Sequence, residues 1–109
     1  AKAMHRLTTK IIKRYNNKKI GFFCSNDDIA NLLLRECIQQ KLRIPEDVEI
    51  IGYDNSPVSN YAAYPITSID QNISLMAKIA IESLDNYIPH ESIVPATLVE
   101  KCTTKKTTD

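Results

Sequence analysis

The stretch that decides the fold is residues 20–34, which read IGFFCSNDDIANLLL. Its first five residues form a continuous apolar run, as is typical of a short strand that is covered on both faces. Small polar side chains follow at 25–28, and their oxygens favour the start of a helix. Apolar residues then recur at helical spacing as far as Leu42. The stretch therefore predicts a buried strand followed directly by a helix.

The chain upstream and just downstream continues this alternation. Apolar residues within 4–15 fall on one helical face, which predicts a helix that Asn16-Asn17 ends. Residues 43–47 predict a turn, because Pro45 lacks the amide that a helix would use. Residues 48–52 (VEIIG) then predict a second buried strand.

The second half of the chain carries weaker but similar signals. Residues 66–69 predict a third strand, rich in β-branched side chains. Residues 73–88 predict a long helix that Asn72 caps and Pro89 stops. Short extended segments follow at 93–94 and 97–99, and we expect the polar residues 102–109 to fray. The order of elements predicts an α/β fold, a mostly parallel sheet flanked by helices.

Composition limits the possible functions. The 109 residues are enough for one domain, and a net charge of +1 argues against a general basic surface for DNA. No apolar run approaches the roughly 20 residues of a membrane helix, and no signal peptide precedes the first helix. The chain starts at Ala1 and holds only two Gly, so we interpret it as a piece of a longer protein. Its three cysteines follow no metal-binding spacing, which indicates reduced thiols in a cytosolic protein rather than a disulfide.

The first helix and the turn after it carry a run of cations. The run comprises Lys2, Arg6, Lys10, Lys13, Arg14, Lys18 and Lys19. It is typical of a solvated helix face. A nucleic-acid patch is the alternative, although no interleaved aromatic residues support it.

Short polar side chains follow each of the three predicted strands. They lie within residues 25–27, 53–55 and 70–71, and ligands of such sheets bind beyond the carboxyl ends of the strands. Carboxylates accept hydroxyl donors and carboxamides both donate and accept, which suits a polyol or a sugar ring. The alternative to ligand binding is equally supported: Asn26 would only cap a helix, and Asp54 would only shape a turn.

Five blocks of sequence, taken together, carry a resemblance to a known family. They are residues 23–27 (FCSND), 42–48 (LRIPEDV), 50–55 (IIGYDN), 64–71 (YPITSIDQ) and 95–99 (PATLV). In this order and spacing the chain resembles the C-terminal part of the LacI/GalR family of bacterial transcription regulators. Departures are the absence of the family's usual Gly near Leu32 and Lys41, and Lys101-Cys102-Thr103 where the family closes with Arg-x-Ser/Thr.

The resemblance implies a lobe of the periplasmic-binding-protein type I fold. The family has an N-terminal helix-turn-helix, a hinge and a two-lobed effector domain. Residues 1–109 would be a partial effector-binding domain, mainly its C-terminal lobe, with no DNA-binding domain. Residues 72–98 would be the crossover into an N-terminal lobe that the chain lacks, so the apolar stripe of the helix 73–88 would need a cover from outside the chain.

The resemblance also implies residue roles. Asn26 and Asp54 match effector-binding residues, Asp27 belongs to the same block, and Gln71 lies at the lobe boundary. The helix 28–42 and the loop 58–63 match the dimer surface. The dimer candidates are Leu33, Leu34, Cys37, Tyr61 and Ala62. For Leu33 and Leu34 simple core packing is the alternative, and it must hold for at least one of them.

The implied function is the sensing of a small-molecule effector, a sugar, related polyol or nucleobase, by a cytoplasmic homodimeric repressor. Operator DNA would be bound only through the missing N-terminal domain. No membrane contact, cofactor or metal is implied. Ligand closure of two lobes would shift the orientation of the DNA-reading heads.

Other functions remain as alternatives. One is a sugar-binding lobe of the periplasmic type. Another is a receiver-like signalling domain, suggested by Asp27-Asp28 and Asp54, although no lysine follows the strand at 66–69. An enzyme is disfavoured, because His5 and His90 lie far apart and neither Gly21 nor Gly52 belongs to a Gly-rich phosphate loop.

Overall fold

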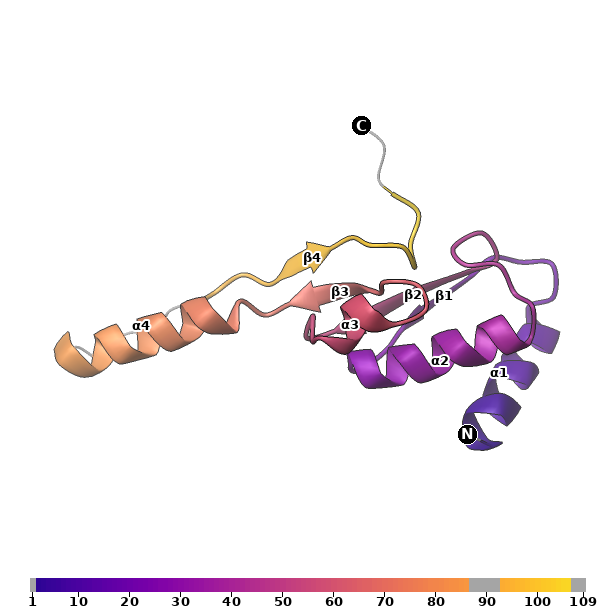
Figure 1. Cartoon of the computed structure of the whole chain (residues 1–109), viewed down its shortest axis with the longest axis horizontal. Coiled ribbons are helices and arrows are strands. Elements are labelled where there is room, and N and C mark those ends of the chain that lie inside the picture. The colour runs from indigo at the N-terminus through magenta and orange to yellow at the C-terminus, as the bar shows by residue number, and fades with distance from the viewer. Residues whose placement is uncertain (1, 87–92, 107–109) are drawn as a thin grey trace.

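The computed structural model describes residues 2–86 and 93–106. Their elements alternate in the order that the sequence predicts (Figure 1). They are α1 (Lys2–Arg14), β1 (Ile20–Phe23), α2 (Asp27–Gln39), β2 (Val48–Tyr53), α3 (Val58–Tyr61), β3 (Thr67–Asp70), α4 (Ile73–Asn86) and β4 (Thr97–Val99). Among the described residues, no helix is long and apolar enough to cross a membrane.

The strands form one mixed sheet in the order β1-β2-β3-β4. β1, β2 and β3 are parallel, with Ile20 opposite Val48 and Ile51 opposite Thr67. β4 returns antiparallel to β3, with Leu98 opposite Ile69. The prediction of an α/β fold with a mostly parallel sheet is therefore confirmed.

The core lies between the sheet and α2. α2 packs on β2, while α1 and α3 pack on α2 (Figure 1). The alternation of β2 explains this, because every second residue from Val48 to Gly52 is buried. The buried apolar side chains are Cys24, Ala30, Leu33, Leu34, Cys37, Ile44, Val48, Ile50 and Ile66. All three cysteines are unpaired, as predicted.

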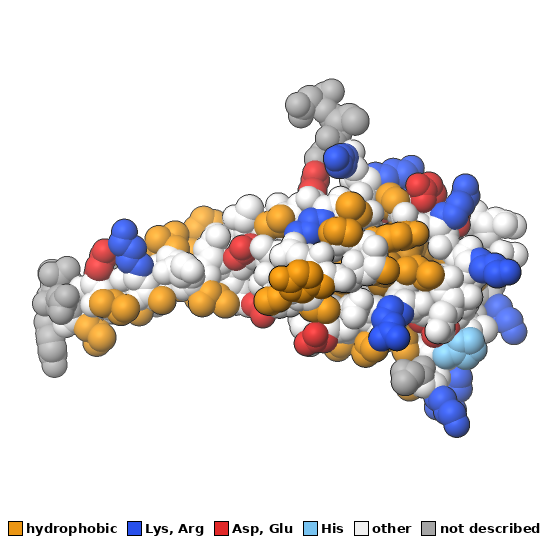
Figure 2. All heavy atoms as spheres, viewed as in Figure 1, with side chains coloured by type: hydrophobic (Ala, Val, Ile, Leu, Met, Phe, Trp, Pro, Cys, Tyr) orange, Lys and Arg blue, Asp and Glu red, His pale blue; other side chains and the backbone are white. Residues whose placement is uncertain are grey.

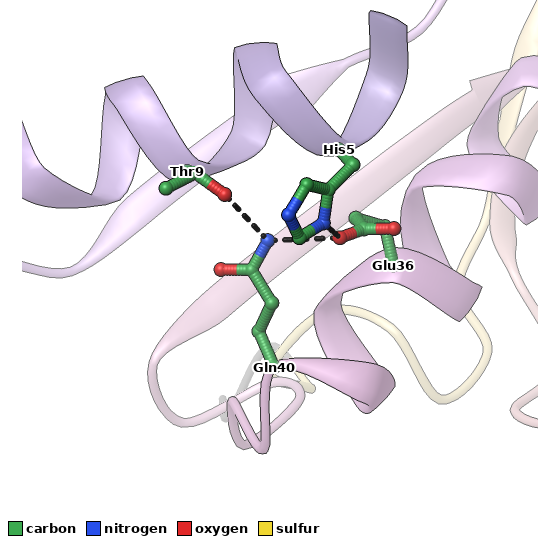
Figure 3. Close-up of polar contacts among 4 residues, drawn as sticks. All are labelled: His5, Thr9, Glu36 and Gln40. Carbon is green, nitrogen blue, oxygen red and sulfur yellow. Dashed lines mark hydrogen bonds and ion pairs between the residues drawn. The ribbon is translucent and has the colours of Figure 1, made fainter. Parts of the chain in front are cut away.

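A polar cluster joins α1 to α2 (Figure 3). The Glu36 carboxylate is buried and contacts the His5 imidazole Nδ1. The Gln40 amide donates to Glu36 Oε1 at 2.9 Å and to the Thr9 hydroxyl at 3.2 Å. The hydrogen bonds from Gln40 and then His5 hold the pKa of Glu36 below its usual value. The cluster thus satisfies a carboxylate that would otherwise be costly to bury.

α4 projects from the body as an arm, whereas β4 lies along β3 in the sheet (Figures 1 and 2). Most of the large apolar side chains of α4 are exposed in the described part of the chain. They are Ile73, Leu75, Met76, Ile81 and Leu84. The arm therefore presents the uncovered apolar stripe that the sequence predicts, although Tyr87, Ile88 and Pro89 lie outside the described residues.

Three expectations are corrected by the structure. The expected loop at 58–63 contains the short helix α3. The side chain of Asn72 does not cap α4 but donates to the Pro95 carbonyl oxygen. The prediction that residues 102–109 fray is wrong for those that the structure describes, because Thr103 is fully buried. Its hydroxyl donates to the Ile50 carbonyl oxygen at 2.6 Å and accepts from the Thr67 amide at 2.9 Å.

Candidate effector pocket

A pocket of about 490 Å³ lies at the carboxyl ends of β2 and β3, where α4 begins. Such crevices beyond the strand ends are where open α/β sheets bind ligands. The lining residues are Asp54, Asn55, Asp70, Asn72, Ile73, Ser74 and Leu75. Two carboxylates and two carboxamides give the pocket both hydrogen-bond acceptors and donors.

Asp54 and Gln71 meet at this edge of the sheet. The Gln71 amide donates to Asp54 Oδ1 at 3.1 Å, across 17 residues of sequence. Asp54 is exposed, and no partner of its second carboxylate oxygen occurs among the described residues. The structure thus brings together two of the four residues that the sequence predicts for effector binding, and it leaves one oxygen available.

The backbone at the pocket is held in unusual conformations. The φ angles are 106° at Asp54, 49° at Asn55 and 57° at Asn72. Positive φ costs energy for residues with a Cβ and persists only where surrounding contacts impose it. Here the Asp54 amide donates to the Ile69 carbonyl oxygen at 2.8 Å, and the Asn55 amide donates to the Ser68 hydroxyl at 2.9 Å. β3 therefore holds the backbone that carries the Asp54 side chain.

Asn55 is held by its side chain as well. Its Nδ2 donates to Asp70 Oδ2 at 3.1 Å, and its Oδ1 accepts from the Lys101 ammonium at 2.7 Å. Lys101 also donates to the Ser59 hydroxyl at 2.7 Å. Burial lowers the pKa of Lys101, an effect that the carboxylates of Asp27 and Asp70 oppose. The segment after β4 therefore fixes the loop that carries Asp54.

Asp70 has both carboxylate oxygens engaged. Oδ1 accepts from the Asn72 amide at 2.7 Å and Oδ2 accepts from Asn55. These hydrogen bonds, that from the Asn72 amide first, hold the pKa of Asp70 below its usual value. Asp70 is thus a fixed negative charge at the pocket wall.

Asp27 has a structural role instead of the predicted contact with an effector. It is 1% exposed. Its Oδ2 accepts from the Ser56 amide at 2.7 Å and the Ser56 hydroxyl at 3.0 Å, and Oδ1 accepts from the Ser68 hydroxyl at 2.6 Å. Because the protein itself occupies both oxygens, the assignment of Asp27 to the effector is corrected: Asp27 anchors the loops beneath the pocket.

Asn26 caps α2. Its Oδ1 accepts from the Ile29 amide at 2.9 Å, in an extended conformation that is usual for this position. Asn26 is exposed at the end of β1, outside the residues that line the pocket. Among the described residues its Nδ2 has no partner, so the capping role leaves a donor available.

The predicted dimer residues divide into two groups. Leu33, Leu34 and Cys37 belong to the chain's own core, where no partner can reach them, so their assignment to a surface is corrected. Tyr61 is 84% exposed, and Ala62 is half-buried against the core. The family resemblance implied a dimer surface on this helix, and the outer side of α2 exposes Ile29 and Leu32 instead.

Two other pockets lie away from the strand ends. One of about 470 Å³ is lined by residues of 12–20 and 42–48, at the amino ends of β1 and β2. The other, of about 510 Å³, lies between α1 and α2 beside His5 and Glu36. None of the residues predicted to bind an effector lines either of them.

Sequence reasoning gave no role at the pocket to several residues that line or support it. Asn55 and Asp70 were noted only as strand ends, Asn72 only as a helix cap and Lys101 only in the last block of the family resemblance. The nearest sequence signal is the sequence DNS at 54–56, since Asp and Asn tolerate positive φ better than other residues with side chains. Lys101 gave no usable signal, because 46 residues separate it from Asn55.

Comparison with known proteins identifies the family of the chain. A family model described as a periplasmic binding protein-like domain matches residues 1–108. The chain is 39% identical over 80 residues to the HTH-type transcriptional repressor PurR of Aliivibrio fischeri (strain ATCC 700601 / ES114). This match covers 72% of the chain but 24% of that repressor, so the chain spans about a quarter of its relative's length.

Two solved structures show the same fold. One is a periplasmic binding protein/LacI transcriptional regulator from Alkaliphilus metalliredigens QYMF complexed with D-xylulofuranose. It shares 30% identity at a TM-score of 0.67, over 79% of this chain and 35% of that one. The other is the Lac repressor dimer bound to operator and the anti-inducer ONPF. It shares 21% identity at a TM-score of 0.76, over 94% of this chain and 36% of that one. The chain therefore belongs to the periplasmic binding protein-like domain family, and it is similar to part of regulators of the LacI type.

Proposed function

We propose that the chain supplies one wall of the effector pocket and a dimer surface in a transcriptional repressor. The observation that carries the proposal is the hydrogen bond from Gln71 to Asp54, which lines the pocket beyond the strand ends. The free Asp54 oxygen accepts a hydroxyl or ring N–H of the ligand. This chemistry fits a sugar, a related polyol or a nucleobase.

Asn26 completes the wall in this proposal. Its Oδ1 serves the helix, whereas its Nδ2 donates to the ligand from the end of β1. The bound D-xylulofuranose of the Alkaliphilus regulator supports a polyhydroxylated ligand. The proposal gives these residues binding roles and no catalytic ones.

The dimer surface lies on the outer side of α2 and on α3. Leu32 and Tyr61 expose apolar area there, with Ala62 at the margin (Figure 2 shows hydrophobic side chains at the surface around α3). Exposed apolar patches of this kind mark interaction sites. The Lac repressor dimer, which shares the fold, supports a second copy of the protein as the partner.

The mechanism requires parts that lie outside the chain. α4 and β4 cross into a second lobe, and ligand between the lobes favours the closed state. The operator is bound by an N-terminal domain, and the ligand acts through its different affinity for two states of the dimer. Such a regulator works in the cytoplasm.

The pocket is tested by nuclear magnetic resonance on the 109-residue chain, with D-ribose, D-xylulose and adenine as probes at millimolar concentration. We expect weak binding, because one wall is present, with amide shifts confined to residues 54, 55, 71 and 72. Asp54→Asn should remove the shifts, while Glu46→Gln, at the opposite edge of the sheet, should keep them. Shifts centred on another pocket, or no shifts with any probe, would refute the proposal.

A further inference from the structure

Exposed Lys and Arg side chains gather on the outer side of α1. Lys2, Arg6, Lys10 and Lys13 recur at intervals of three or four residues, and all four are exposed. Residues at this spacing are neighbours on a helix, so the four side chains form one row, the basic stripe. The buried Thr8 lies on the opposite side of the helix by the same periodicity. At 1.5 Å per residue the basic stripe is about 16 Å long.

In the described part of the chain, no ion pair with an acidic residue balances the basic stripe. The first 26 residues hold seven of the 14 Lys and Arg and none of the 13 Asp and Glu. The ion pairs found in the described residues all involve other side chains, namely His5–Glu36, Lys19–Glu49 and Arg43–Asp47. Figure 2 shows Lys and Arg gathered mainly at the end of the molecule that carries α1.

The basic stripe is unfavourable for the isolated helix. Like charges four residues apart repel each other, as at Lys2–Arg6 and Arg6–Lys10. Cations in the first turn also oppose the helix dipole, and that turn has no acidic residue to offset them. A partner with dense negative charge would relieve both effects.

The composition of the basic stripe distinguishes between classes of partner. Protein interfaces are depleted of Lys and are anchored by buried apolar or aromatic side chains, which the stripe lacks. Phosphates of a nucleic-acid duplex are contacted mainly by Lys and Arg, without base recognition. A duplex carries about one charge per 1.7 Å of its axis, so several phosphates can face a row of this length.

We propose that the basic stripe binds the phosphate backbone of double-stranded DNA, independently of sequence. Because the rest of the chain is acidic, the contact is local and strongest at low salt. This contact is independent of the effector pocket, which lies at the ends of β2 and β3.

The test is fluorescence anisotropy of a labelled 20-base-pair duplex of mixed sequence, titrated with the 109-residue chain at several salt concentrations. Four phosphate contacts give a slope of about −3.6 in log K against log salt, or a fall of about 150-fold between about 50 and 200 mM. Lys10→Gln with Lys13→Gln should halve the slope. Gln is as good a helix former as Lys, so the variant should fold, and circular dichroism checks this.

The matched control is Lys78→Gln with Lys106→Gln, which removes the same charge at exposed positions outside the basic stripe. It should keep the slope of the unmodified chain. Equal weakening by the two double variants would overturn the proposal, because only net charge would matter. Absence of salt-dependent binding would also overturn it. Tighter binding of poly-L-glutamate than of the duplex would assign the surface to an acidic protein instead.

Discussion

The Ser68 hydroxyl donates to the Asp27 carboxylate at 2.6 Å and joins β3 to the start of α2 across 41 residues of sequence. Ser56 donates twice to the same carboxylate from the loop after β2. One buried acid thus fixes the two strand ends that form the pocket. Substitutions at Asp27 and at its neighbour Gly52 should therefore affect folding.

Replacing Asp27 should destabilise the fold. Asp27→Asn puts an amide donor where three donors already point, so buried hydroxyl and amide groups lose their acceptor. We expect a loss of about 1–3 kcal/mol in the free energy of unfolding, measured by urea denaturation. Asp28→Asn is the matched control, since Asp28 is the exposed neighbour in the same helical turn. Equal losses at both positions would show that only the helix dipole is involved.

Gly52 is the one glycine that the fold requires. A Cβ at this position would lie 2.2 Å from Asp27 Oδ1, whereas a Cβ at Gly21 meets nothing within 4 Å. Gly52→Ala should therefore cost about 1–3 kcal/mol through forced displacement, by thermal or urea unfolding. Gly21→Ala should be neutral or stabilising, because Gly weakens a strand. A tolerated Gly52→Ala would contradict the position of Asp27.

The dimer surface is tested by light scattering. We expect Leu32→Asp to leave the chain folded and to convert a dimer into a monomer, because Leu32 is 45% exposed on α2. Met76→Asp on the uncovered side of α4 should leave the dimer intact. If Met76→Asp gave a monomer and Leu32→Asp did not, the dimer contact would lie on α4 instead. Leu34→Asp should unfold the chain, since its side chain is fully buried.

The cysteines should differ in reactivity. Cys102 is exposed, whereas burial raises the pKa of Cys24 and raises that of Cys37 to about 11. Only the thiolate reacts, so one thiol of the native chain should react rapidly with a disulfide reagent at neutral pH. All three should react after denaturation. Cys102→Ser should remove the rapid phase, and a rapid phase that survives this change would contradict the burial of Cys24 and Cys37.

Stability should fall in acid, partly through Asp70. Its folded-state pKa lies below the unfolded value, because the Asn72 amide and the Asn55 side chain favour the carboxylate. The stabilisation is therefore present above the usual carboxyl pKa of about 3.9 and is lost as the pH falls through the folded-state value. Asp70→Asn should reduce the acid-induced drop in the urea midpoint. An unchanged drop would show that other carboxylates, such as Glu36 and Asp47, account for it.

Much of the fold could be predicted from the sequence. The apolar run at 20–24, the strand pattern at 48–52 and the helical period after Asn26 are local patterns, and each corresponds to an observed element. The proximity of Asp54 and Gln71 could also be predicted, because both residues follow strands and parallel strands end at the same edge of the sheet.

The division between ligand-facing and structural residues was decided only by the tertiary structure. Asn26, Asp27 and Asp54 are equally polar in sequence, yet Asp27 is buried because serines from two distant loops converge on it. Leu32, Leu33 and Leu34 are identical side chains, and only the position of the sheet under α2 decides which of them is left exposed. Thr103 is buried because the chain returns beside β2 and β3 after the arm, a long-range contact that no local pattern encodes. The sequence by itself thus determined the periodicity and the order of the elements, and packing between distant segments decided which polar groups remain free to bind a ligand.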